Sequence, residues 1–219
     1  MNTSRNKPVG SLRSATSTPG RVIRVVRPLN GFRKQQRVDP LFRITRNIWQ
    51  GRFASRQRLD ELRRNAITHI INVGESPNQL TEADGPFQRI VWNPIEDLVR
   101  IPTADAIGCV NAVHECVCDM ASNVFIHCVA GWNRSPTVLW LYLIACGIDS
   151  TVAKNMIASV SYDAVPAHTK LIDDILVHEI AAYGATRFIP HPRPEALTAP
   201  NVGEQYGERE PPMTRDLKS

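Results

Sequence analysis

The chain has 219 residues, of which 42% are hydrophobic, so it has room for one domain with a sizeable core and terminal tails. No apolar run is long enough to cross a bilayer as a helix, and the N-terminus lacks the apolar core of a signal peptide. The five cysteines are odd in number and show no paired spacing, which indicates a reducing compartment. We therefore expect an intracellular protein, cytoplasmic or nuclear, with no transmembrane segment.

The net charge of +5 is unevenly distributed. Residues 1–46 contain eleven Lys or Arg and one acid, Asp39, so this segment carries +10 and the remainder −5. Residues 1–40 are polar and basic, which predicts a largely disordered arm interrupted by Val22–Val26, a possible edge strand or docking segment. The arm is either a solvated tail or a tether to a polyanion such as RNA or an acidic surface. Its Arg-rich composition also leaves organelle targeting open.

After the arm, apolar residues alternate between strand and helix periods. The predicted strands are Phe42–Gln50, Ile67–Val73, Phe87–Trp92 and Val124–His127. The predicted helices are Ser55–Asn65, Thr103–Met120, Ser135–Cys146, Ser150–Ser161 and Ala167–Tyr183, with Ser55 and Thr103 as N-caps. Strands separated by helices predict an α/β fold with a mostly parallel central sheet, flanked by helices and binding ligands at the carboxyl ends of its strands.

Residues 187–219 contain six prolines and alternate in charge without periodicity, which predicts a Pro-rich disordered tail. The expected organisation is therefore a basic arm over residues 1–40, a folded domain over 41–186 and a tail over 187–219.

The most informative run reads His-Cys-Val-Ala-Gly-Trp-Asn-Arg-Ser over residues 127–135, between a predicted strand and a predicted helix. A strand, a tight loop and a helix N-terminus form an anion site, because loop amides and the helix dipole point at the ligand. Cys128 lies where this field favours a thiolate, and the planar fork of Arg134 matches two phosphate oxygens. Gly131 permits a turn that a side chain would obstruct. A nucleophile and an anion clamp in one loop predict phosphoryl transfer to sulfur.

The pattern His-Cys-x-x-Gly-x-x-Arg-Ser resembles the signature of the cysteine-dependent protein tyrosine phosphatase superfamily. The flanking sequence, from about Arg43 to about Gly184, is similar to the dual-specificity branch. The resemblance implies a dual-specificity-phosphatase-like fold and a phosphocysteine intermediate. It also implies metal-independent hydrolysis of phosphotyrosine and phosphoserine or phosphothreonine on protein substrates, without a cofactor.

The resemblance also implies roles for individual residues. Cys128 is expected to be the nucleophile. Ser135 is expected to hydrogen-bond the sulfur and help it leave, or to cap the helix, or both. His127 is expected to support the loop from behind. The residues expected to bind the substrate phosphate are Val129, Ala130, Gly131, Trp132, Asn133 and Arg134.

The leaving group needs a proton, which the family takes from an aspartate on a separate loop about thirty residues before the cysteine. Here Asn93–Leu98 occupies that place. Asp97 is the expected general acid, and by reversal the base that activates water. The adjacent Glu96 is its rival, whereas Asp105 lies too far into the next helix.

Two alternative functions stay open at this point. Asn133 replaces the serine common in the dual-specificity loop and resembles the RNA 5′-triphosphatase relatives. The basic arm, and a bulky aromatic Trp132 at the mouth of the loop, would suit a nucleic acid. Trp132 can also stack on a phenyl ring or pack on the domain. A phospho-binding pseudophosphatase is the other alternative, although Cys128 and Arg134 are both retained. Val129 and Trp132 stand where inositol-phosphate enzymes tend to carry lysines, which disfavours that substrate class.

The run His114–Cys118 superficially resembles a metal site. Cys116 and Cys118 lie on different faces of the predicted helix, and no second ligand pair has zinc spacing. We therefore predict no metal site, and we expect Cys109 and Cys116 to be core residues.

Overall fold

The computed structural model describes residues 41–200. The predicted basic arm, including Val22–Val26, and residues 201–219 of the predicted tail lie outside this range. Within the described range, no helix is both long and apolar enough to cross a membrane.

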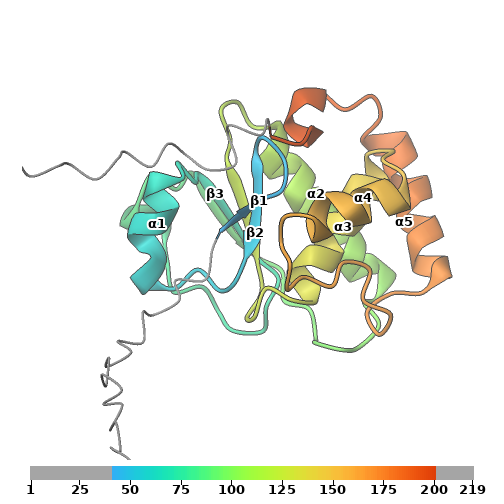
Figure 1. Ribbon diagram of the computed structural model, residues 1–219, viewed down its shortest axis with the longest axis horizontal. Coiled ribbons are helices and arrows are strands. Elements are labelled where there is room, and N and C mark those ends of the chain that lie inside the picture. The colour runs from blue at the N-terminus through green and yellow to red at the C-terminus, as the bar shows by residue number, and fades with distance from the viewer. Residues whose placement is uncertain (1–40, 201–219) are drawn as a thin grey trace, which may run out of the picture. The chain divides into compact units, whose positions relative to one another are not determined.

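The described residues form a five-stranded sheet in the order β1-β2-β5-β3-β4 (Figure 1). The strands are β1 (Phe42–Arg43), β2 (Ile48–Gly51), β3 (His69–Asn72), β4 (Arg89–Trp92) and β5 (Val124–His127). Strands β2, β5, β3 and β4 pair in parallel, and β1 pairs antiparallel with β2 at one edge. The predicted α/β fold with a mostly parallel central sheet is confirmed.

The predicted single strand Phe42–Gln50 is in fact two short strands joined by a turn. The Ile44 amide donates to the Ile48 carbonyl at 2.8 Å, and the Ile48 amide donates to Thr45 Oγ1 at 3.1 Å. A threonine side chain that bonds the local backbone competes with a continuous strand ladder. The apolar spacing alone does not reveal this competition.

Helices cover both faces of the sheet, with α1 on one side and α2 to α5 on the other (Figure 1). The α-helices are α1 (Leu59–Arg64), α2 (Thr103–Cys118), α3 (Arg134–Ala145), α4 (Ser150–Ala158) and α5 (Asp174–Arg187). The short 3₁₀ helices are η1 (Arg56–Arg58), η2 (Glu82–Asp84) and η3 (Pro194–Leu197).

The two predicted N-caps, Ser55 and Thr103, do not cap their helices, and α5 starts later than predicted. Helix α5 begins at Asp174 rather than at Ala167. Asp173 is its N-cap and accepts a hydrogen bond from the Leu176 amide at 2.8 Å. Thr103 is the first residue of α2 rather than its cap, and its hydroxyl donates to Glu179. Ser55 precedes η1 but its side chain makes no capping hydrogen bond in the described structure.

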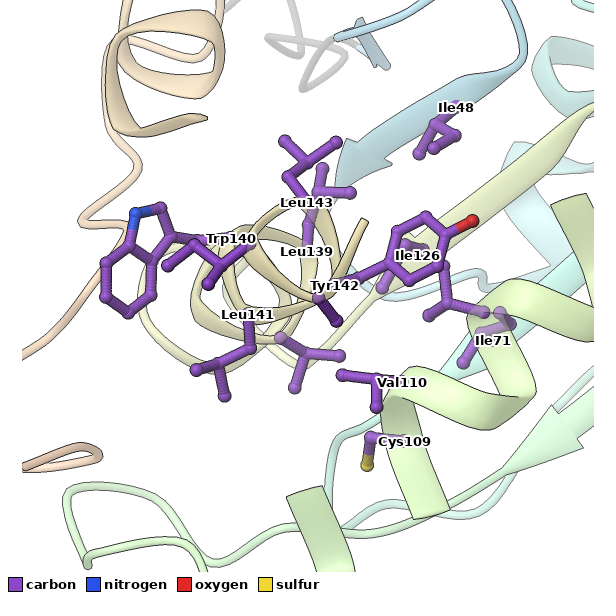
Figure 2. Close-up of a cluster of buried hydrophobic side chains, with 14 of the residues drawn as sticks. Ile48, Ile71, Cys109, Val110, Ile126, Leu139, Trp140, Leu141, Tyr142 and Leu143 are labelled. Carbon is purple, nitrogen blue, oxygen red and sulfur yellow. The ribbon is translucent and has the colours of Figure 1, made fainter. Parts of the chain in front are cut away.

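Helix α3 is the centre of the larger core, and all twelve of its residues are buried. Figure 2 shows its side chains extending in several directions, between apolar residues of the sheet and of α2. The labelled neighbours are Ile48, Ile71 and Ile126 from the sheet and Cys109 and Val110 from α2. A second cluster forms under α1 and includes Leu62, Ile67, Ile70, Phe87 and Phe125. Because α3 is buried all round, the loop that precedes it has a rigid support.

The prediction that a disordered tail begins at residue 187 is wrong for residues 187–200. Ala196 and Leu197 of η3 are buried in the main core, together with Phe188. The Arg46 amide also donates to the Thr198 carbonyl at 2.9 Å, which attaches this segment to the β1–β2 turn. The prolines of this segment predicted a disordered tail, because its few apolar residues show no helix or strand period.

Gly184 provides a test of how closely α5 packs on α3. A Cβ at Gly184 would overlap the backbone carbonyl of Ala145, so Gly184→Ala should force the two helices apart. We expect the free energy of unfolding, measured with urea, to fall by about 1–3 kcal/mol. Gly108→Ala is the control, since Gly108 is exposed in α2 and an added Cβ there meets no atom within 4 Å. Gly108→Ala should raise the free energy of unfolding by about 0.5–1 kcal/mol. Equal changes in that free energy for Gly184→Ala and Gly108→Ala would contradict the close packing of α5 on α3.

Candidate active site

The loop between β5 and α3 surrounds the sulfur of Cys128. The Gly131 amide donates to Cys128 Sγ at 3.3 Å, and the Ser135 hydroxyl donates to it at 3.4 Å. Ser135 lies inside the first turn of α3, so the alternative role as N-cap does not apply. Hydrogen bonds to a charged acceptor are the strong ones, so two donors on one sulfur suit a thiolate that attacks or leaves.

The carbonyl groups of the loop are bound by the surrounding scaffold. The Val129 carbonyl accepts from the Phe53 amide at 3.2 Å, and the Trp132 carbonyl accepts from the Val165 amide at 2.7 Å. The Gly131 carbonyl accepts from the Gln50 side chain at 2.6 Å. In a trans peptide the N–H points opposite to the C=O. The next amides in the chain are therefore directed away from the scaffold, which makes the loop interior a donor-rich anion cradle.

Gly131 has the backbone conformation that the sequence suggested. Its φ is +76°, and a Cβ there would lie 2.6 Å from the carbonyl carbon of Gly51. Only glycine permits both the left-handed backbone and this close approach to β2.

Arg134 is 4% exposed and holds two loops together. Its Nη1 donates to the Ile95 carbonyl at 3.0 Å and lies 3.4 Å from Glu75 Oε2. Its Nε lies 3.6 Å from Asp97 Oδ1 and has no hydrogen-bond partner among the described residues. A buried guanidinium donor without a partner is costly unless an anion satisfies it.

The structure separates the two rival carboxylates of the Asn93–Leu98 loop. Asp97 is half-buried and reaches Arg134, whereas Glu96 is exposed. A third carboxylate, Glu75, also reaches Arg134, and the sequence analysis did not identify it. The available signal was its place just after β3, at the sheet edge that also carries Cys128.

His127 lies behind the loop and is fully buried. Its Nδ1 lies 3.2 Å from the Cys128 carbonyl, and its ring contacts Phe53 edge-on and stacks on Phe125. Burial lowers the pKa of His127 to about 3, so the ring is neutral at pH 7 and donates from Nδ1 to the carbonyl.

The remaining predicted loop residues lie at the mouth of the cradle. Val129 and Trp132 are exposed, and the Arg52 guanidinium carbon lies 5.7 Å from the centre of the Trp132 ring. Ala130 lines a small pocket beside Trp132 and Arg52. Asn133 precedes α3, and its side chain makes no capping hydrogen bond in the described structure.

Gln50 is a second residue that the sequence analysis missed. Its amide is buried, donates to the Gly131 carbonyl and to Ser135 Oγ, and accepts from the Ser161 hydroxyl at 2.9 Å. It thus connects the loop and the first turn of α3 to the segment after α4. Its only sequence signal was a polar residue at the end of an apolar strand.

Comparison with known proteins assigns the chain to a family. A family model described as "Dual specificity phosphatase, catalytic domain" matches residues 48–170, more than half of the chain. The chain belongs to this family. The predicted dual-specificity branch of the superfamily is therefore confirmed.

Relatives in sequence include two dual-specificity phosphatases from mammals. The chain is 36% identical over 98 residues to dual specificity protein phosphatase 15 of Homo sapiens, which is 44% of this chain and 32% of that protein. The protein of the same name from Mus musculus is 32% identical over 103 residues, 47% of this chain and 42% of that protein. The matches thus span less than half the length of these relatives.

The crystal structure of DUSP15 is similar with a TM-score of 0.51 and 25% identity, covering 76% of this chain and 97% of that one. The crystal structure of PTPMT1, at 17% identity and a TM-score of 0.54, covers 68% of this chain and 98% of that one, and shows likeness of fold alone.

Gln50→Leu tests whether this buried amide supports the loop. The change removes the hydrogen-bond partner that the described structure gives to the Gly131 carbonyl and to the Ser161 hydroxyl. We expect the free energy of unfolding, measured with urea, to fall by at least about 2 kcal/mol. The exposed Gln88 supplies the control, and Gln88→Leu should stay within about 0.5 kcal/mol of the parent. Similar stabilities for the two variants would show that Gln50 is not a support.

Proposed function

We propose that the chain is a phosphatase that hydrolyses phosphotyrosine and phosphoserine or phosphothreonine on proteins through a phosphocysteine at Cys128. The observation that carries the proposal is the environment of Cys128 Sγ, which accepts hydrogen bonds from the Gly131 amide and the Ser135 hydroxyl. Arg134, whose Nε has no hydrogen-bond partner among the described residues, lies at the other end of the same loop. Family membership supports the same chemistry.

In the first step the Cys128 thiolate attacks phosphorus, so an S–P bond forms as the bond to the leaving oxygen breaks. Arg134 and the inward loop amides bind the phosphoryl oxygens, and a phosphoryl oxygen supplies the hydrogen-bond partner that Arg134 Nε lacks among the described residues. Asp97 donates its proton to the leaving oxygen, because it is the member of its loop that reaches Arg134.

In the second step Asp97, now ionised, takes a proton from water, whose oxygen attacks phosphorus. An O–P bond forms and the S–P bond breaks, which returns the sulfur as a thiolate and releases inorganic phosphate. The Ser135 hydroxyl stabilises the departing sulfur through the hydrogen bond it already makes. None of these steps requires a metal ion.

The two central residues can be tested by substitution. Cys128→Ser should abolish turnover of a phosphotyrosine peptide yet retain peptide binding, because an alcohol is a far weaker nucleophile than a thiolate. Arg134→Lys should also fail, since an ammonium cannot reproduce the planar fork. Cys146→Ser and Arg187→Lys are matched controls outside the site and should leave turnover near the parent value. Near-normal turnover by purified Cys128→Ser would refute the mechanism.

The general acid is tested by the dependence on the leaving group. Asp97→Asn should lower turnover by about 10²–10⁴-fold for a phosphoserine peptide, whose alkoxide needs a proton. The loss should shrink for an activated aryl phosphate, whose oxygen leaves with less protonation. Glu96→Gln is the matched control and should show neither effect. If Glu96→Gln has this leaving-group pattern and Asp97→Asn lacks it, the assignment moves by one residue.

Hydrolysis of RNA 5′-triphosphate is the second candidate, and the exposed Trp132 beside Arg52 favours it. A base stacks well on such a surface. Glu75 acts against it, because a carboxylate 3.4 Å from Arg134 repels a polyphosphate. Turnover of a phosphopeptide and of 5′-triphosphorylated RNA should be compared in the parent and in Trp132→Ala. A loss confined to RNA would favour the second candidate.

A further inference from the structure

A group of metal-ligand side chains lies at the C-terminal end of α2, apart from the proposed catalytic residues. His114 and Cys118 lie one turn apart on α2, and His191 belongs to the segment that follows α5. One ligand atom from each lies within 4.8 Å of the other two. The Cys118 sulfur is 3.5 Å from His114 Nε2. All three side chains are half-buried.

Neighbouring groups hold both imidazole rings in place. The His114 ring stacks on Phe188 with centroids 4.0 Å apart, and its centroid lies 5.1 Å from that of His191. His191 Nε2 is 2.9 Å from the Tyr142 hydroxyl, and His191 Nδ1 accepts from the Arg193 amide at 3.0 Å. Because Nδ1 accepts from the Arg193 amide, it carries the lone pair of the neutral ring, and a metal ion there would replace that amide. The Nε2–H would keep its bond to the Tyr142 hydroxyl and orient the ring, as outer partners of metal-bound histidines usually do.

We propose that His114, Cys118 and His191 bind one zinc-class divalent ion, which ties the segment after α5 to α2. Two imidazoles and a thiolate are a donor set that zinc prefers. Zinc bonds of about 2.0–2.3 Å place tetrahedral ligand atoms roughly 3.3–3.8 Å apart. The Cys118 sulfur and His114 Nε2 already lie in this range, and ligand atoms at the 4.8 Å limit need to approach by about 1 Å. Water or an external ligand completes the four positions.

The charges around the cluster are mixed but suit a cation. Burial lowers the pKa of His114 and of His191, so both rings are neutral at pH 7 and each has one nitrogen lone pair that can bind a metal ion. Glu115 favours positive charge at His114 and Glu195 favours it at His191, whereas Arg193 opposes it at His191. Burial raises the pKa of the Cys118 thiol, and Arg193 offsets part of this rise. When the ion binds, the Cys118 thiol releases its proton to solvent.

The ion would strengthen a contact that the chain already makes. Arg193 Nη1 donates to the Val117 carbonyl at 2.9 Å, to Ser122 Oγ at 3.1 Å and to the Asp119 carbonyl, all at the end of α2. These bonds attach the same segment to the same helix end. The role of the metal is therefore structural, and the proposal does not depend on the proposed phosphatase activity.

The experiment uses the full chain with Cys128→Ser, so that the loop thiol cannot take the ion. After chelator treatment, Co²⁺ is titrated as a spectroscopic substitute for Zn²⁺. We expect one Co²⁺ per chain, a thiolate-to-metal charge-transfer band, loss of that band when Zn²⁺ is added, and a higher melting temperature. Cys118→Ser should abolish the band. His114→Ala and His191→Ala should each weaken binding by at least about tenfold.

The matched control is the exposed His178→Ala, which should bind Co²⁺ like the parent. His191→Gln retains a polar group for Tyr142, and its circular dichroism without metal shows whether a loss of binding reflects loss of fold. No band in the parent would overturn the proposal, as would a band that survives Cys118→Ser. Unchanged affinity in folded His191→Gln and His191→Ala would also overturn it, because the ion would then sit on α2 alone.

Discussion

The surrounding scaffold binds carbonyl groups of the loop between β5 and α3, and the rest of the site depends on the peptide orientation that this fixes. Three loop carbonyls are held by Phe53, Gln50 and Val165, which come from two separate parts of the chain, the end of β2 and the segment after α4. An isolated loop of this length would not keep its amides convergent, since each peptide loses entropy when it is fixed. The packed sheet and the fully buried helix fix the two ends of the loop, and their packing offsets that entropy cost.

Arg134 shows how the same scaffold prepares for an anion. The guanidinium is almost fully buried, and its nearest carboxylates, Asp97 and Glu75, are the more exposed partners. A buried cation held by exposed carboxylates can exchange them for a phosphate oxygen without leaving its position, because the Ile95 carbonyl still holds Nη1. In the proposed reaction the contact between Arg134 and Asp97 also brings the general acid to the phosphate.

The sequence predicted the parts of this structure that follow from short-range chemistry. The signature run and the apolar periods identified the loop, β5, α3 and the parallel sheet, because their spacing is a direct consequence of strand and helix geometry. Gln50 and Glu75 escaped prediction, since their roles depend on which distant residues they meet. His191 escaped for a related reason: the prolines around it suggested a tail, while Phe188 and Leu197 anchor that segment in the core.

The most direct test of the account is to observe the covalent intermediate. The chain should be mixed with an activated aryl phosphate, stopped with acid within one turnover, and analysed by intact mass and by peptide mapping. The account predicts one added phosphoryl group on the peptide that contains Cys128, with more accumulating in Ser135→Ala, where the sulfur leaves more slowly. Rapid turnover with no phosphoryl group on Cys128 at any time, in either protein, would contradict it.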